Sequence, residues 1–473
     1  MIFRKLKVLS DDEMLKIVEG AFRVLQNTGC RFEDKKCMDE LADLGCDVDR
    51  GKLTAKFPDQ VILDTLDKAP SLLPVDDRPK VRVASANTRK ILDYETKTMR
   101  PGKIEDVRNV ILLCNYLKNI TMASAGVAAS DIPPEAVEVY NTGVLIKYSE
   151  KLFNQWVSTP DNVPLVFEMA KVLTGSEEEL AKSKLLSCML DSTSPLSYRE
   201  SQLQIARQYA SINLPIAICS APQTGATAPA SMAGCLAVCV AELLAGLVWV
   251  RALDSESAVA LGNMTTVSDP KNGQGCCATP ENTLINLGAH QIIRYLGYCT
   301  GVSGFASDSC DFDLQLGWEK ATSGVLSWAA GTDMLGRAGV ISDGFSMEQL
   351  ALDNEVLDML CRVGEGVATD DDGLALNVVK DVGPGGHFLS EDHTLAHARD
   401  FWLPKIFSRK NYSQWVADGK KTVADIAHEQ VTEIISNNSL SLQVSEDQAK
   451  AIDEIVVKRI ESLGGSLKEG DAL

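Results

Sequence analysis

The chain has 473 residues, of which 45% are hydrophobic and 23% are charged, a balance typical of a folded globular protein rather than a disordered or collagen-like one. Its 65 acidic residues outnumber its 46 basic residues, for a formal charge of −19, which opposes binding to a phosphate backbone. We therefore expect no nucleic-acid partner.

The charged first residues are not followed by the apolar segment of a signal peptide. The 13 cysteines include no CxxC pair, and free thiols are typical of a reducing compartment, so we expect a cytoplasmic protein. The longest apolar run covers residues 233–250 and is interrupted by Glu242. A marginal membrane span and a buried helix of a large α/β protein share this composition, and we predict the buried helix and no membrane contact.

The first 85 residues are predicted to form a helical segment. Ser10 can cap a helix in which Met14, Val18 and Leu25 lie on one apolar face, and Gly29 can end it. A proline-rich stretch near residues 70–79 then separates this segment from the rest of the chain. We place the domain boundaries at 1–85, 86–367 and 368–473, with the last region a helical extension.

Between these two regions the chain repeats a short β-branched run followed by a helical segment. The predicted strands are 91–94, 120–126, 152–157, 185–190, 215–219, 259–264, 298–303 and 335–341, and the intervening helices include 135–148, 165–173, 201–209, 232–252, 282–296 and 315–331. Eight such units favour an α/β fold of the (β/α)8 TIM-barrel type. A doubly wound open sheet is the alternative, but neither a GxGxxG nor a GxxxxGK[ST] loop occurs.

Catalytic groups of such barrels follow the C-terminal ends of the strands. The predicted ends carry amides, hydroxyls, acids and a few aromatic rings, but neither His nor Lys, which argues against a Schiff-base lysine and a metal hydrolase. His393 and His397 have HxxxH spacing, but Thr394 stands where a zincin has Glu. We interpret both histidines as structural and predict no metal ligands.

An acid-bearing polar pocket with an aromatic wall suits a cationic small molecule. A quaternary ammonium donates no hydrogen bond and is held by aromatic faces and nearby anions. Other interpretations stay open: Asp311 and Asp313 can be helix N-caps, and Trp156 and Phe305 can be core residues.

Several phrases resemble the trimethylamine:corrinoid methyltransferase family. They are Pro195-Leu196-Ser197-Tyr198, Gln223-Thr224-Gly225-Ala226-Thr227-Ala228-Pro229, Gly317-Trp318-Glu319-Lys320-Ala321, the run 345–355, and Gly383-Pro384-Gly385-Gly386-His387-Phe388-Leu389 with His393-Thr394 after it. The resemblance implies an α/β barrel. Founding members carry pyrrolysine after strand 7, where this chain has Asp308-Ser309-Cys310, so it resembles the non-pyrrolysine branch, several members of which demethylate betaines.

The resemblance implies methyl transfer from a quaternary amine to the cob(I)alamin of a separate corrinoid protein, with no cofactor held permanently. Glycine betaine is the first expectation, and proline betaine, carnitine and γ-butyrobetaine are also compatible. We expect catalytic roles for Asp308 and Asp191, and substrate contacts from Asn154, Gln155, Trp156, Gln223, Phe305, Arg337, Phe345 and His387. We also expect a homo-oligomer. Another barrel enzyme, such as a lyase, and a non-catalytic binder of a cationic molecule are the alternatives.

Overall fold

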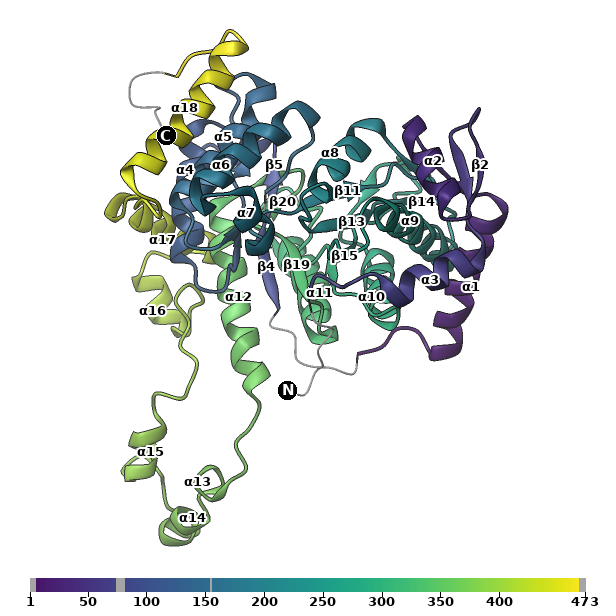
Figure 1. The fold of residues 1–473 in the computed structure, drawn as a ribbon. Helices are drawn as coiled ribbons and strands as arrows, with labels where there is room; N and C mark the ends of the chain where they lie inside the picture. Colours follow the sequence, from purple (N-terminus) through teal and green to yellow (C-terminus); the bar gives the residue numbers. More distant parts are fainter. Residues whose placement is uncertain (1–5, 74–80, 154, 468–473) are drawn as a thin grey trace.

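A curled sheet of eight parallel strands forms the centre of the protein in this computed structural model, which describes residues 6–73, 81–153 and 155–467 (Figure 1). In chain order the strands are β4 (Arg82–Ser85), β8 (Met122–Ala123), β10 (Leu152–Phe153), β11 (Cys188–Asp191), β13 (Ile216–Ser220), β15 (Val259–Asn263), β18 (Thr300–Val302) and β19 (Met334–Ala338). The last strand pairs with the first, and the ladder is open only between β10 and β11 among the described strands. The predicted (β/α)8 class is confirmed.

Helices follow the strands and cover the outside of the sheet. They are α4 (Ile104–Tyr116), α5 (Val137–Tyr148), α6 (Val163–Thr174), α7 (Glu177–Ser183), α8 (Glu200–Ala210), α9 (Met232–Leu253), α10 (Pro280–Tyr295), α11 (Leu314–Ala330) and α12 (Met347–Glu365). Short strands decorate the loops: β5 (Asn87–Thr88), β9 (Gly126–Val127), β14 (Gln223–Thr224), β16 (Thr266–Ser268), β17 (Gly275–Cys276), β20 (Val340–Ile341) and β21 (Gly344–Phe345).

The predicted first strand at 91–94 is wrong. Those residues form β6 (Lys90–Asp93), which makes a hairpin with β7 (Thr98–Pro101) outside the barrel, where the Asp93 carboxylate accepts a hydrogen bond from Thr96 N in the turn. The barrel begins earlier, at β4, which pairs with β19 and β8. The apolar run of β6 resembles a barrel strand because Ile91 and Leu92 are buried, and β6 pairs with the short loop strand β21.

The N-terminal segment is mixed rather than helical throughout. Helices α1 (Asp11–Asn27), α2 (Lys35–Asp43) and α3 (Asp59–Lys68) accompany strands β1 (Cys30–Phe32), β2 (Asp47–Asp49) and β3 (Thr54–Lys56), and β1 pairs with β12 (Ser197–Tyr198) of the barrel region. Ser10 caps α1 as predicted, because its hydroxyl accepts from Glu13 N. The buried face of α1 packs against α9.

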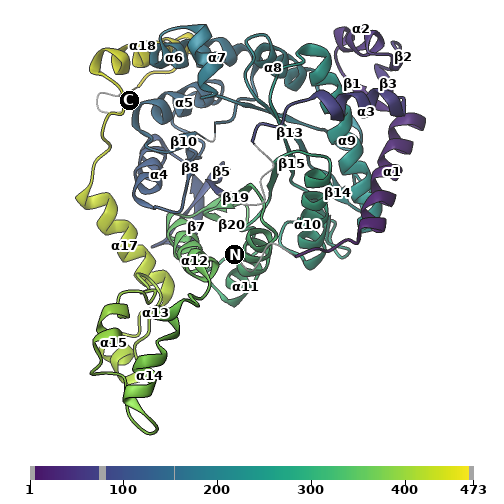
Figure 2. The same cartoon turned by 60° about the horizontal axis from the view of Figure 1, so that its bottom comes forward.

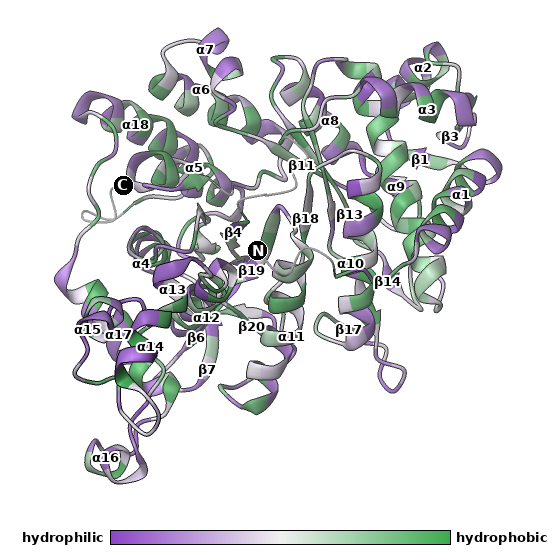
Figure 3. Cartoon of the chain, turned by 90° about the horizontal axis from the view of Figure 1, so that it is seen from below, coloured by the Kyte–Doolittle hydropathy of each residue, from purple (hydrophilic) through white to green (hydrophobic). Residues whose placement is uncertain are grey.

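Helix α9 is the apolar run singled out in the sequence. Its 22 residues are long and apolar enough to cross a membrane, but 83% of its most apolar 18-residue stretch is buried inside the protein. The helix is mostly green in Figure 3, and α1, α10 and strand β13 pack around it. Glu242, which interrupts the run, is buried too. Its carboxylate accepts hydrogen bonds from the hydroxyls of Ser192 and Ser220, each at 2.6 Å, and these contacts compensate for its burial.

Small residues line the inside of the barrel. In β15, Val259 and Leu261 are buried against the helices, while Ala260 and Gly262 alternate with them and face inward. The same alternation places Ala217, Gly301 and Gly336 inside. TIM barrels usually fill this space with Val, Ile and Leu. Here Met189 and Met334 are larger, but most of the other inward positions are Ala or Gly, and a cavity remains inside the barrel.

The chain leaves the barrel after α12 and later returns to it. Residues 367–405, called the arm below, contain α13 (Asp371–Leu374), α14 (Leu376–Val382) and α15 (Asp392–His397), and they project away from the barrel (Figures 1 and 2). The chain comes back through α16 (Tyr412–Ala417), α17 (Val423–Asn437) and α18 (Glu446–Ser462). Helix α17 packs against α12 and α4, and α18 packs against α5 and α6.

Candidate functional site

A cavity of about 450 Å³ occupies the hollow barrel and reaches the loops after the C-terminal ends of the strands. Its polar lining residues are Ser85, Asn87, Thr88, Gln155, Asn263, Ser303, Arg337, Ser342 and Asp343. A second cavity, of about 710 Å³, lies beside it over strands 1–3 and shares Asn87, Thr88, Gln155 and Trp156. The volume of the inner cavity suits a small-molecule site.

Trp156 supplies the aromatic surface at this site. Its side chain borders both cavities, and no other aromatic residue borders the inner one in the described part of the chain. The residue is 49% exposed, so it is not part of the packed core. Gln155 also borders both cavities, whereas Asn154 lies outside the described residues.

Asp191 ends β11 on the inward-facing side of that strand. Met189, two residues earlier on the same face, lines the inner cavity. The Asp191 Oδ1 atom is buried and has no hydrogen-bond partner among the described residues. Burial alone raises the pKa of this carboxyl from 3.8 to about 6. An unpaired buried carboxylate is a site for a cation.

Arg337 and Ser303 lie on the opposite side of the ring of strands. Arg337 lies near the end of β19, which is strand 8, and Ser303 follows β18, which is strand 7. Asp191 ends strand 4 and Trp156 follows strand 3. Arg337 and Ser303 both border the inner cavity, and neither side chain has a hydrogen-bond or ion-pair partner within residues 6–73, 81–153 and 155–467. A guanidinium beside a free hydroxyl is a donor set for a carboxylate.

Asp191 and Arg337 both act electrostatically on the same thiol, that of Cys219. Cys219 on β13 lines the cavity, and burial raises the pKa of its thiol, with Asp191 raising that pKa further and Arg337 lowering it. Both charges therefore act on the same interior. They make no ion pair with each other, so the described residues leave each charge available for a bound molecule.

A buried ion pair holds the backbone around Arg337, whose φ of +68° lies in the left-handed region. Lys320 Nζ on α11 donates to Asp353 Oδ2 on α12 at 2.8 Å, and the same oxygen accepts from Gly339 N, also at 2.8 Å. Gln349 donates to the other oxygen of Asp353. These contacts fix the turn after β19 and, through it, the direction of the Arg337 side chain.

The two phenylalanines predicted to bind substrate are core residues instead. Phe305 is fully buried, with its ring packed over Gly324 of α11, where an added Cβ would lie 2.6 Å from Phe305 Cε1. Phe345 is also fully buried, and its ring covers Gly339. Neither ring borders the inner cavity. A position at the end of a strand does not by itself determine whether an aromatic ring faces the barrel interior or packs under a helix.

Besides Asp191, three other described polar candidates are not among the residues that line either barrel cavity. Gln223 donates through Nε2 to Ser268 Oγ at 2.7 Å and so closes a loop of β14 and β16. Both oxygens of Asp308 accept from Cys277 N, and Oδ2 also accepts from Ala278 N, which ties two loops together. His387 is exposed in the arm. The structure thus gives Gln223 and Asp308 loop-holding contacts. Of the predicted residues that the structure describes, it brings Gln155, Trp156, Asp191 and Arg337 to the barrel interior.

Ser303, the last residue of the predicted strand 298–303, is a site residue that the sequence analysis did not select. Its signal was its position, since it directly follows β18 as Arg337 directly precedes the end of β19. Asn263 also lines the cavity, but its amide donates to Asn286 and its oxygen accepts from Thr265. Of these two residues, only Ser303 has a buried polar atom without a partner, its hydroxyl oxygen, which is available to a ligand.

The hollow interior leads to a prediction for Ala260→Leu. The larger side chain would enter the cavity, so ligand binding should fall at least about tenfold while the free energy of unfolding changes by less than about 1 kcal/mol. Ala245→Leu, at a fully buried position of α9, should cost about 1–3 kcal/mol because that site is packed. Denaturant unfolding and titration calorimetry measure both. Equal destabilisation by the two variants would contradict a hollow barrel.

Comparison with known proteins adds a family to this geometry. The family model described as Trimethylamine methyltransferase (MTTB) matches residues 1–464. The trimethylamine methyltransferase MttB of Desulfitobacterium hafniense is 29% identical over 90% of this chain and 89% of its own length. A glycine betaine methyltransferase of Desulfitobacterium hafniense is 27% identical over 92% of this chain and 93% of its own length.

The fold is also similar to a solved structure. The crystal structure of the monomethylamine methyltransferase MtmB of Methanosarcina barkeri matches with a TM-score of 0.50 and 13% identity, over 98% of this chain and 90% of that one. This likeness concerns the fold alone. Because the family model covers nearly the whole chain, the protein belongs to the trimethylamine methyltransferase (MTTB) family of methyltransferases.

Proposed function

We propose that this methyltransferase takes a methyl group from a betaine, with glycine betaine the first candidate, and passes it to the cob(I)alamin of a separate corrinoid protein. The observation that carries the proposal is the distribution of unpaired charge in the barrel. Trp156, an aromatic residue, follows strand 3, and the unpartnered carboxylate of Asp191 ends strand 4. Arg337 lies on strand 8, on the opposite side of the barrel. A zwitterion presents the matching charges at its two ends.

The cationic end of the ligand fits the side with Trp156. A quaternary ammonium has no N–H to donate, so an aromatic face and a nearby anion stabilise it without a hydrogen bond. Asp191 provides that anion. A neutral ligand would leave the negative charge of this buried carboxylate without a compensating positive charge.

The anionic end fits the side with Arg337 and Ser303. Trimethylamine has no carboxylate, so it would leave the guanidinium and the free hydroxyl without a partner inside the barrel. A betaine carboxylate accepts from both. This difference favours a betaine over the tertiary amine for which the family is described.

The chemistry needs few protein groups. When the C–N bond of a quaternary ammonium breaks, its electron pair stays on nitrogen and the leaving group is already a neutral tertiary amine. No proton has to be supplied, which agrees with cavity walls that carry neither His nor Lys among the described residues. The cob(I)alamin of the partner would supply the nucleophile for the methyl carbon. The residues of this chain hold the substrate, aim its methyl group and exclude water.

The larger cavity beside the barrel supports a separate corrinoid partner. It shares Trp156 and Gln155 with the inner cavity, so a molecule that enters it comes next to the proposed ammonium site. We also propose a cytoplasmic homo-oligomer, and the exposed apolar residues of the arm, such as Leu389 and Leu395, support association.

Calorimetry with three related ligands tests the proposal. Glycine betaine carries both charges, 3,3-dimethylbutyrate replaces the ammonium nitrogen with carbon, and tetramethylammonium lacks the carboxylate. We expect glycine betaine to bind at least about tenfold more tightly than either analogue, since each lacks one charged contact. Equal binding of glycine betaine and 3,3-dimethylbutyrate would contradict the cation site.

Trp156→Leu should weaken glycine betaine binding about 2- to 30-fold, because a cation over an aromatic face gains about 0.5–2 kcal/mol. The leucine keeps bulk and removes the ring. Trp318→Leu is the matched control, because Trp318 is 67% exposed on α11 and borders neither barrel cavity. Unchanged affinity in Trp156→Leu would show that the ring does not contact the ligand.

Arg337→Met should act on the other end of the ligand. Affinity for glycine betaine should fall about tenfold or more, since the charge-assisted contact is worth about 1.5–3 kcal/mol, while affinity for tetramethylammonium should stay within about twofold. The same titrations measure both. A parallel loss for the two ligands would indicate that the substitution disturbs the cavity rather than a carboxylate contact.

Two other functions remain distinguishable by experiment. A lyase or another barrel enzyme would act on the cation without any corrinoid acceptor. A non-catalytic binder would hold a betaine tightly and transfer no methyl group. The family membership favours methyl transfer over both.

A further inference from the structure

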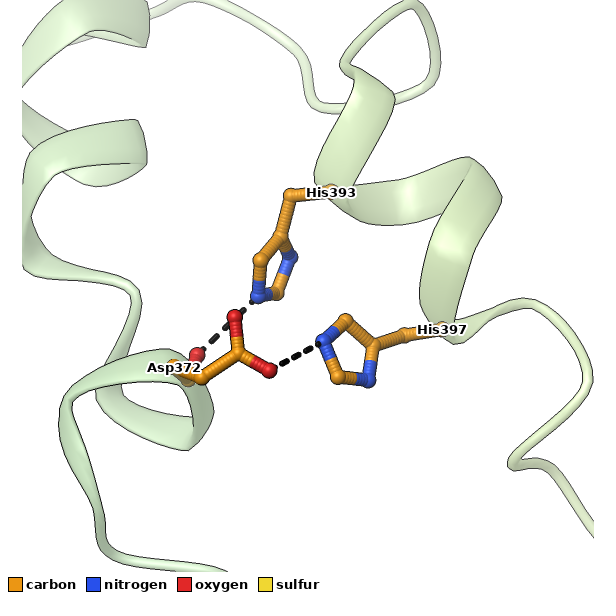
Figure 4. Close-up of side chains that lie close together, drawn as sticks. All are labelled: Asp372, His393 and His397. Carbon is orange, nitrogen blue, oxygen red and sulfur yellow. Dashed lines mark hydrogen bonds and ion pairs between the residues drawn. The ribbon is translucent and has the colours of Figure 1, made fainter.

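The arm brings together three side chains that ligate metals, far from the barrel. Asp372 follows the start of α13, and His393 and His397 lie one turn apart on α15 (Figure 4). One ligand atom from each lies within 4.8 Å of the other two. Figure 4 shows both imidazoles turned toward Asp372. This chain segment takes no part in the proposed methyl-transfer site.

Each ring nitrogen of His397 faces a carboxylate oxygen, an arrangement that suits a metal ligand. Its Nε2 lies 3.2 Å from Asp372 Oδ2, and its Nδ1 lies 2.6 Å from Asp400 Oδ2. Histidines that bind metals commonly donate their second ring N–H to a carboxylate, which fixes the ring and its tautomer. Asp400 is placed for this role, and its own backbone oxygen accepts from Arg362 Nε at 3.2 Å.

The spacing also suits a small divalent ion. Ligand atoms about 2.0–2.2 Å from a tetrahedral Zn²⁺ are about 3.4 Å apart, close to the 3.2 Å between His397 and Asp372. His393 Nε2 lies 3.0 Å from the backbone oxygen of Asp372, and a ligand atom of His393 lies within 4.8 Å of those of Asp372 and His397. Imidazole and carboxylate together favour Zn²⁺ over Mg²⁺ or Ca²⁺.

The arm needs such a crosslink because it has no hydrophobic core. None of residues 367–405 is buried, and its apolar side chains include Val367 and Leu389, which are 85% and 87% exposed. Hydrogen bonds and ion pairs link the outgoing residues 367–382 to the returning residues 391–405 through Asp372, which contacts His393 and His397. Small units without a core depend on metals, disulfides or association.

We propose that Asp372, His393 and His397 bind one Zn²⁺ ion that crosslinks the two sides of the arm, with Asp400 orienting His397. The fourth position is left to water. The HxxxH pair that the sequence interpretation treated as two structural histidines is then a ligand pair, completed by an acid about 20 residues earlier that no local motif reveals. The site is structural, and methyl transfer proceeds elsewhere.

The test uses the full-length protein, stripped with a chelator and titrated with Zn²⁺ and with Co²⁺. We expect one ion per chain, a cobalt absorption spectrum of a low-coordinate N/O site, and slower protease cleavage within 367–405 once metal is bound. His393→Gln and Asp372→Asn should each weaken Zn²⁺ binding at least about tenfold. His387→Gln removes another arm histidine outside the cluster and should bind as the parent does.

The circular dichroism of each variant checks that the barrel is folded, and the arm has no core whose loss could unfold it. Failure of the stripped parent to bind stoichiometric Zn²⁺ would overturn the proposal. So would His393→Gln binding as tightly as His387→Gln. Unchanged cleavage of the arm with and without metal would overturn the crosslinking role.

Discussion

Lys320→Met should destabilise the protein by about 3–5 kcal/mol, because it leaves the buried carboxylate of Asp353 without its cation. Only 6% of the Lys320 side chain and 1% of the Asp353 side chain are exposed. Burial lowers the pKa of Lys320 and raises the pKa of Asp353, and the contact between them opposes both shifts. Methionine preserves the length of the side chain, so the lost charge dominates the effect.

Denaturant unfolding of the parent, Lys320→Met and the double variant Lys320→Met/Asp353→Asn measures this effect. The double variant should recover part of the loss, since an amide is cheaper to bury than an unpaired carboxylate and still accepts from Gly339 N. Lys182→Met on the surface helix α7, where both ion-pair partners are exposed, should change stability by less than about 1 kcal/mol. A loss below about 1 kcal/mol for Lys320→Met would contradict the buried pair.

Asp191→Asn should stabilise the ligand-free protein at pH 7 and weaken ligand binding at the same time. Burial raises the pKa of Asp191 from 3.8 to about 6, so the ionised carboxylate is less stable in the folded protein than in the unfolded chain. The difference corresponds to at most about 3 kcal/mol. Loss of the anion should lower affinity for a quaternary ammonium about 10- to 100-fold.

The two effects of Asp191 depend on pH in opposite ways. The folded protein binds more protons than the unfolded chain between pH 3.8 and about 6, so the stability contributed by this group falls as pH rises through that window. The advantage of Asp191→Asn should therefore vanish near pH 4 and be complete above pH 6. Betaine affinity of the parent should fall below pH 6 as the carboxyl becomes protonated.

Unfolding experiments and calorimetry between pH 4 and pH 8 measure both curves. Asp311→Asn, at an exposed loop position, is the control and should change neither stability nor affinity. A destabilised Asp191→Asn at pH 7 would indicate that the carboxylate has a protein partner, and the cation site would then be wrong.

The sequence predicted the barrel because the βα repeat is a local pattern that survives without tertiary information. Seven of the eight predicted strands overlap barrel strands, and the first failed where a hairpin, β6 and β7, has the same apolar pattern as a barrel strand. The segments that resemble the family include residues that stabilise the backbone around the site. Lys320 and Asp353 come from two of them and form the buried pair, a contact that sequence spacing does not reveal.

The site was harder to predict, because a residue at a strand end can face the barrel or the helices. Trp156 and Phe345 are both aromatic residues at predicted strand ends, yet one is half exposed beside the cavity and the other is fully buried under a turn. Asp191 and Asp308 differ in the same way, since only Asp308 meets backbone N–H groups of a neighbouring loop. Such contacts form between segments far apart in the sequence.

Methyl transfer to cob(I)alamin, with glycine betaine and trimethylamine compared under the same conditions, tests the central claim most directly. The charge distribution from Asp191 to Arg337 predicts that glycine betaine reacts with the higher kcat/KM and yields dimethylglycine and methylcobalamin in equal amounts. A higher kcat/KM for trimethylamine, or no transfer from any quaternary amine, would contradict it.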